Sequence, residues 1–301
     1  MRLKTLIKLC PVIFPLMLAA FKGQAQRIEN NLQMSLSAGR QAENFNWSIA
    51  GNISGQSPNV LSELKWRNVS GLNYSASLQW NFWKKLVLTG GYSRTSVSSG
   101  NVSDIDYTAD NRTQPNYNQN FSDNKGYSSA WFAGAGFAII DNNRIYLTAF
   151  AGYGINRQSL FIVDLTGQFP NLNSSYDAQW KGPFLKVKSS VRIWRNLKLA
   201  ADVTYNQVTY SAQGDWNLIS QFQHPASYRH SAKGYGVNFA GNLIYCITAR
   251  IVINAGYSYF NWQTGNGTDQ LYLSSGQVDK TQLNGVYRNG HLIGGGIILL
   301  Y

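Results

Sequence analysis

The sequence predicts an all-β protein, a ten-stranded antiparallel transmembrane β-barrel of the outer-membrane type. Three observations lead to this prediction: apolar and polar residues alternate, short and long connections alternate, and no run of 18 apolar residues follows Ala25. The missing run excludes a membrane-spanning helix in that part of the chain. Aromatic residues make up 14% of the chain and charged residues only 13%, a charged fraction about half that of a soluble domain.

The alternation is clearest over residues 72–80, 197–205 and 250–260. In the first segment Leu72, Tyr74, Ala76, Leu78 and Trp80 share one face, and only Asn, Ser and Gln lie between them. A soluble sandwich alternates as well, with its apolar face turned inward. Here the apolar face ends in aromatic residues, which is typical of strands with lipid outside, a polar lumen inside and aromatic girdles at the interfaces.

Ten strands are expected, joined by connections of two kinds. The strands lie near 31–48, 64–80, 86–96, 128–140, 144–161, 179–193, 197–210, 235–247, 250–263 and 291–301. The connections 81–85, 141–143, 194–196 and the one near 248 are tight, whereas 49–63, 97–127, 162–178, 211–234 and 264–290 are long and polar. This asymmetry predicts one barrel over residues 26–301, with five long loops outside the cell and both termini in the periplasm.

Residues 1–25 have the features of a signal peptide. Arg2, Lys4 and Lys8 precede the short apolar stretch 9–20, and Gly23-Gln24-Ala25 forms a small-x-small cleavage site. A retained anchor is the alternative, although the stretch is too short for a spanning helix. The formal net charge of the whole chain is +12. Lys and Arg are scattered singly, so we expect no nucleic-acid partner.

Several segments, in this order, resemble the omptins, a family of outer-membrane endopeptidases with ten-stranded barrels. These segments are Leu61-Ser62-Glu63-Leu64-Lys65-Trp66, Val102-Ser103-Asp104-Ile105-Asp106-Tyr107, Ala151-Gly152-Tyr153-Gly154-Ile155-Asn156-Arg157, Trp180-Lys181-Gly182-Pro183-Phe184 and Tyr228-Arg229. The resemblance implies catalysis by an Asp-Asp pair facing an Asp-His pair across the barrel mouth, with an attacking water between them. Asp104 and Asp106 match the first pair, and Asp215 matches the aspartate of the second.

The histidine of the second pair corresponds to Asn217, which departs from the family pattern. Histidine exchanges protons near neutral pH, whereas asparagine can only hold a water by hydrogen bonds. Loss of a general base costs roughly a hundred- to ten-thousandfold in rate. The resemblance therefore predicts an attenuated endopeptidase, unless His224 in the same loop replaces the missing base. Otherwise we expect His224 and His230 to be solvated loop residues. An alternative function for the acidic residues is calcium binding through the side-chain oxygens of Asp104, Asp106, Asp110 and Asn111.

Two further implications of the resemblance concern ligands. Gln213 and Phe45 occupy the positions of an acidic pocket for basic substrates, with Glu43 nearby, so we expect no preference for dibasic sites. Tyr153, Arg157 and Lys233 match a lipopolysaccharide-binding surface, and basic side chains there pair with lipid phosphates; ordinary snorkelling of these side chains is the alternative. No metal or other cofactor is expected, apart from a lipopolysaccharide requirement for activity.

Three functions remain open from the sequence. The first is an omptin-like endopeptidase acting on a peptide or protein at the mouth. The second is an inactive surface-binding or adhesin-like barrel, favoured by Asn217 and Gln213. The third is a passive pore, which a ten-stranded barrel disfavours because side chains fill so narrow a lumen. In each case we expect a monomer in contact with outer-membrane lipid.

Overall fold

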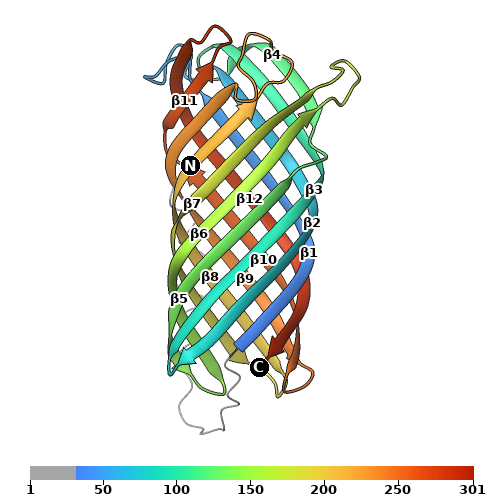
Figure 1. Ribbon diagram of the computed structural model, residues 1–301, viewed down its shortest axis with the longest axis vertical. Helices are drawn as coiled ribbons and strands as arrows, with labels where there is room; N and C mark the ends of the chain where they lie inside the picture. Colours follow the sequence, from blue (N-terminus) through green and yellow to red (C-terminus); the bar gives the residue numbers. More distant parts are fainter. Residues whose placement is uncertain (1–31) are drawn as a thin grey trace.

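Residues 32–301 form a closed β-barrel in the computed structural model, which describes these residues (Figure 1). The expected signal peptide lies outside them. The strands of this region are β1 Leu32–Ile49, β2 Ser62–Trp83, β3 Leu86–Ala109, β4 Thr113–Ser122, β5 Tyr127–Asp141, β6 Ile145–Val163, β7 Asn173–Arg192, β8 Leu197–Asp215, β9 Tyr228–Cys246, β10 Ile251–Thr264, β11 Gly267–Tyr272 and β12 Val278–Leu300. β1 pairs with β12 to close the wall. At one end of the wall, β11 pairs with both β9 and β12, and β4 pairs with β3 and, at one residue, with β6. The predicted fold is confirmed.

Among residues 32–301 no helix is long and apolar enough to cross a membrane.

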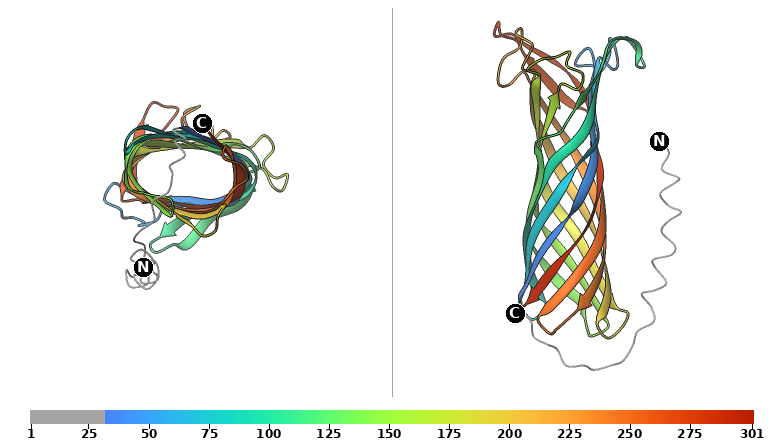
Figure 2. Two further views of the ribbon diagram at one scale, coloured as in Figure 1. Left: turned by 90° about the horizontal axis from the view of Figure 1, so that it is seen from below. Right: turned by 90° about the vertical axis from the view of Figure 1, so that its right-hand side faces the viewer.

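The wall strands run further than the sequence predicts. β3 continues to Ala109 and forms a hairpin with β4 inside the segment 97–127, which was expected to be a loop. β12 begins at Val278 instead of near residue 291. These extensions lie at the end opposite the C terminus (Figure 1; Figure 2, right). Water wets their outer face, so both faces carry polar residues and the alternation that marks the lipid-facing segments is lost.

The outer face of the barrel carries the predicted apolar band. Leu72, Leu185 and Ile293 are 58%, 64% and 62% exposed, although each lies in the middle of a strand. Tyr205 and Tyr235 on neighbouring strands stack with ring centroids 6.2 Å apart. An exposed apolar surface of this extent is stable only against lipid.

Side chains close the lumen at three levels. An aromatic plug lies nearest the long loops and consists of Phe45, Trp47, Trp66, Tyr176, Trp180, Tyr210, Tyr228 and Trp262. Below it is a polar layer formed by Gln41, Glu43, Gln158 and Arg288. Nearer the termini, Phe132, Phe150 and Phe184 pack with Val87 into a phenylalanine constriction. These three levels obstruct the lumen, which keeps cavities between and below them.

Candidate functional site

Asp104 and Asp106 lie on the lumen side of β3, above the apolar band. Asp104 is only 7% exposed, and its Oδ1 is buried without a hydrogen-bond partner among the described residues. Burial, with a smaller contribution from the charge of Asp106, raises the pKa of Asp104 to about 8. The pKa of Asp106 is raised as well, because the effect of burial exceeds the opposing effect of a hydrogen bond from Ser62. Asp104 is therefore mostly protonated at neutral pH.

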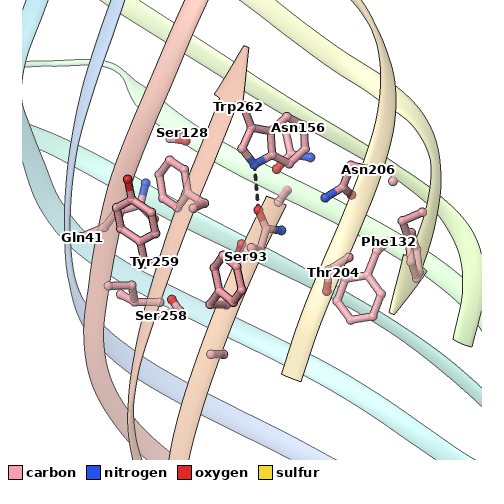
Figure 3. A pocket seen from close by; sticks show the side chains of 18 of the residues that line it. Gln41, Ser93, Ser128, Phe132, Asn156, Thr204, Asn206, Ser258, Tyr259 and Trp262 are labelled. Carbon is pink, nitrogen blue, oxygen red and sulfur yellow. Dashed lines mark hydrogen bonds between the residues drawn. The ribbon is translucent and has the colours of Figure 1, made fainter. Parts of the chain in front are cut away.

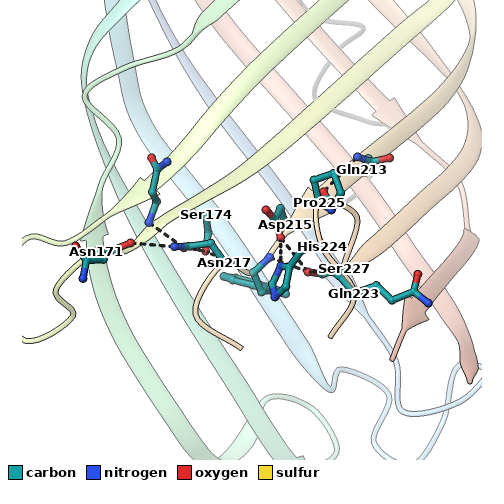
Figure 4. Close-up of polar contacts among 11 residues, drawn as sticks. Asn171, Ser174, Gln213, Asp215, Asn217, Gln223, His224, Pro225 and Ser227 are labelled. Atoms are coloured by element: carbon teal, nitrogen blue, oxygen red, sulfur yellow. Dashed lines mark hydrogen bonds and ion pairs between the residues drawn. The ribbon is translucent and has the colours of Figure 1, made fainter. Parts of the chain in front are cut away.

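Asp215 ends β8 and pairs with a histidine. Its Oδ1 lies 2.6 Å from Nδ1 of His224 and accepts a hydrogen bond from Ser227 Oγ at 3.3 Å (Figure 4). The His224 side chain is 40% exposed. A carboxylate beside one ring nitrogen orients the imidazole, as in many acid–base sites. An Asp–His pair is thus present, but its histidine is His224 and not the residue at position 217.

Asn217 has a structural role in this arrangement. Its Oδ1 accepts hydrogen bonds from the Asn173 backbone N–H at 2.9 Å and from Ser174 Oγ at 3.0 Å. Its Nδ2 donates to the Asn171 carbonyl oxygen at 2.9 Å (Figure 4). The amide fastens the segment that follows β8 to the start of β7 and to the connection before it. These contacts occupy both ends of the amide, which leaves it poorly placed to orient a water.

The two acidic pairs lie on different faces of the barrel wall. Gly214 and Trp216, which flank Asp215, face the aromatic plug: a Cβ on Gly214 would lie 2.1 Å from the Tyr228 ring, and Trp216 stacks on that ring at 5.9 Å. Because successive residues of a strand point to opposite faces, Asp215 points away from the lumen. Among residues 32–301, no hydrogen bond or ion pair joins the β3 carboxylates to Asp215 or His224.

Tyr228 is a buried lumen residue whose pKa is influenced by both acidic pairs. Burial raises its pKa well above the usual value, and the charges of Asp104, Asp269, Tyr210 and Asp215 add to the rise in that order. Its hydroxyl therefore stays protonated, and its ring lies within electrostatic reach of carboxylates on both walls.

His230 is buried, which corrects the expectation of a solvated loop residue. Its Nδ1 lies 2.7 Å from Tyr176 Oη, which in turn lies 2.5 Å from Tyr210 Oη. Its Nε2 lies 3.1 Å from Asp269 Oδ1, close enough for an ion pair but outside hydrogen-bond geometry. Tyr228, His230 and Ala232 point inward at every second position of β9. That alternation is visible in the sequence and could have placed His230 in the core.

Glu43, the remaining candidate for an acidic substrate pocket, belongs to the polar layer. Arg288 donates to Glu43 Oε2 from Nη2 at 2.7 Å and from Nε at 3.2 Å, and Gln158 donates to Glu43 Oε1 at 2.8 Å. Phe45 is fully buried. Glu43 is therefore paired inside the wall and does not offer a free charge to a basic ligand. Below this layer is a cavity of about 280 Å³ (Figure 3).

The three residues expected to bind lipid lie together on the outer wall. Tyr153, Arg157 and Lys233 are all exposed. Strand register places Lys233, Thr209, Lys181 and Ile155 in one row across β9, β8, β7 and β6, with Arg157 two residues above it and Tyr153 two below. Lys181 is also exposed and joins the cluster. The sequence alone did not single it out, because the row forms only when strands pair.

The calcium alternative gains no support. Asp110 Oδ1 accepts a hydrogen bond from the Asn59 backbone N–H at 2.7 Å, and Asn111 Oδ1 accepts one from Asn59 Nδ2 at 3.0 Å. These contacts tie the β3–β4 turn to the β1–β2 loop. Within the described part of the chain, no group of three or more His, Cys, Asp and Glu side chains has a geometry that could hold a metal ion.

The geometry defines an outer-membrane β-barrel with an omptin-like fold. The chain superimposes on the outer membrane protease OmpT from Escherichia coli with a TM-score of 0.74 at 15% identity, over 92% of this chain and 99% of that one. At that identity the likeness concerns the fold alone. A family model described as Protochlamydia outer membrane protein (Pom) matches residues 35–291, and the chain belongs to this family.

Other barrels are more distant. The translocator domain of the autotransporter NalP from Neisseria meningitidis has a TM-score of 0.37 at 11% identity, over 93% of this chain and 90% of that one. Ail from Yersinia pestis has a TM-score of 0.30 at 10% identity, over 89% of this chain and 99% of that one. No curated protein matches the chain by sequence.

Proposed function

We propose that this outer-membrane protein is a surface-binding barrel that holds a peptide or protein segment at its mouth without cleaving it efficiently. The observation that carries the proposal is the placement of Asp215 on the wall face away from Asp104 and Asp106. A water held by the β3 carboxylates then has neither Asp215 nor His224 opposite it. The structural hydrogen bonds of Asn217 support the same conclusion.

The chemistry of the β3 carboxylates suggests a cationic ligand group. A Lys or Arg side chain close to Asp106 would favour ionisation of both carboxyls and would lower the pKa of Asp104 from about 8. Binding would then release a proton below that pH. By linkage, the affinity for a basic peptide rises as the pH increases toward 8 and levels off above it.

Binding and cleavage can be measured on one sample. The barrel, reconstituted with lipopolysaccharide, is incubated with a fluorescent peptide library at pH 6 and pH 8. We expect retention of basic peptides, stronger at pH 8, with no new fragments. The variant Asp104→Asn/Asp106→Asn should lose this retention. Asp110→Asn, which removes an acidic group from the same hairpin, is the matched control, and equal loss in both variants contradicts a site at the β3 pair.

A second candidate is the endopeptidase itself, with water activated between Asp104/Asp106 and Asp215. The 2.6 Å contact between Asp215 and His224 favours it, because a carboxylate beside one ring nitrogen orients the imidazole as a base. Fragments above the level of an Asp104→Ala/Asp106→Ala variant would establish cleavage, and their absence would exclude it. Asn217→His tests whether the position itself restores activity.

The surroundings of the barrel form part of the proposal. The long loops would face the outside of the cell and both termini the periplasm. Tyr153, Arg157 and Lys233, with Lys181 between them, would hold a lipopolysaccharide phosphate, since guanidinium and ammonium groups pair with phosphate oxygens. The obstructed lumen supports a binder over a passive pore, and the binder would be a monomer.

A further inference from the structure

The lumen holds a cavity at the end of the barrel where the short turns lie, and the C terminus lies at this end (Figure 1). The space there is a cavity of about 970 Å³. Six cationic residues line it: Arg144, Lys186, Lys188, Arg192, Arg195 and Lys198. We call it the basic cavity. It lies at the opposite end of the lumen from the β3 carboxylates, so its function does not depend on theirs.

The positive charges of the basic cavity exceed the negative charges near them. Asp141 is the one carboxylate among its lining residues, all of which belong to the described region. Asp202, just above it, pairs with Lys186 at 3.2 Å. Lys188 donates to the neutral amide oxygen of Gln79 at 3.2 Å. Two carboxylates cannot balance six cations, and crowded like charges repel each other unless anions bind among them.

The basic cavity is closed on its inner side. Phe132, Phe150 and Phe184 line it and belong to the phenylalanine constriction. The polar layer and the aromatic plug block the lumen beyond. A ligand therefore enters and leaves through the termini end alone, so the charges line a blind site and not a conduction path.

We propose that the basic cavity binds a polyanion that carries phosphate groups. Guanidinium groups fit phosphate in a two-pronged geometry and ammonium groups supply point charges, and both are present here. The low-dielectric wall of the barrel strengthens their attraction for an anion relative to open water. A volume of about 970 Å³ accommodates a ligand of several phosphate groups.

The test uses the purified full-length barrel in neutral detergent with tripolyphosphate as the probe. Calorimetry should detect binding that weakens as salt is added, because counterions screen the attraction. Lys188→Gln/Arg192→Gln should weaken it roughly tenfold or more, the loss expected for charge-assisted hydrogen bonds. The matched control, Arg67→Gln/Lys280→Gln, removes two exposed positive charges above the apolar band and should leave the affinity unchanged.

The outcome that overturns the proposal is equal affinity in the wild type and the cavity variant, or equal weakening in both variants. Heat-dependent electrophoretic mobility confirms that each variant is folded. A second arm repeats the titration in neutral vesicles with and without phosphatidylglycerol. Competition by the anionic lipid identifies a lipid headgroup as the source of the phosphate, and unchanged affinity identifies a soluble ligand; both results support a phosphate site.

Discussion

At the scale of single residues, Asp104 couples the barrel mouth to pH. Its pKa is raised from 3.8 to about 8, chiefly by burial. A carboxyl whose pKa is higher in the folded state stabilises that state fully below the unfolded pKa. The contribution is lost as the pH rises through the folded pKa. The free energy of unfolding should therefore fall between about pH 4 and pH 8 on account of Asp104.

The change Asp104→Asn removes this titration. Burial also raises the pKa of Asp123, to about 7, against opposing hydrogen bonds from backbone N–H groups. Between pH 7 and pH 8 the remaining loss thus belongs mainly to Asp104, about 1 kcal/mol per pH unit. Unfolding midpoints in urea should fall across this window in the wild type and in Asp123→Asn, but stay level in Asp104→Asn. A parallel slope in all three would show that Asp104 is not protonated in the folded barrel.

At the scale of strands, the ion pair between Arg288 and Glu43 ties β12 to β1 in the lumen. The Arg288 guanidinium also donates to Ser128 Oγ on β5 at 2.7 Å, so it links three strands. Arg288→Met leaves the Glu43 carboxylate buried without its cation, and we expect a loss of about 3–5 kcal/mol. Glu43→Gln/Arg288→Met should recover most of this loss, because no buried charge remains. Thermal midpoints of the single and double variants provide the measurement, and additive losses would contradict a coupled pair.

The strands also mark how far sequence reasoning reaches. Tyr74, Ala76 and Leu78 alternate with polar residues and point to lipid, so the sequence places this strand and its faces correctly. In β4 and in the upper part of β3, water on the outside permits polar residues on both faces, so strand and loop share one composition. Spatial relations lie beyond the sequence as well: the pairing of His224 with Asp215 depends on how the loop folds back.

The sequence predicts the candidate site only in part, because it shows which residues share a face of a strand but not which face points into the lumen. The spacing of Asp104 and Asp106 gives them a common face, which the structure turns inward. The face of Asp215 depends on strand parity, and the inward-pointing Gly214 and Trp216 fix that parity through their contacts with Tyr228. The divergence of the two acidic pairs therefore becomes visible only when these contacts fix which face of β8 points inward.

At the scale of the whole molecule, the three closures of the lumen act in series. The aromatic plug and the phenylalanine constriction are separate clusters, with the polar layer between them. Opening one level leaves the other two intact. We therefore expect planar-bilayer conductance at background for the wild type, for Trp66→Ala in the plug and for Phe184→Ala in the constriction. Each truncation costs about 3–5 kcal/mol of stability, so folding is verified by heat-dependent mobility. Steady conductance from either single variant would contradict closure in series. It would mean that a single level blocks the lumen, as the gate of a pore does.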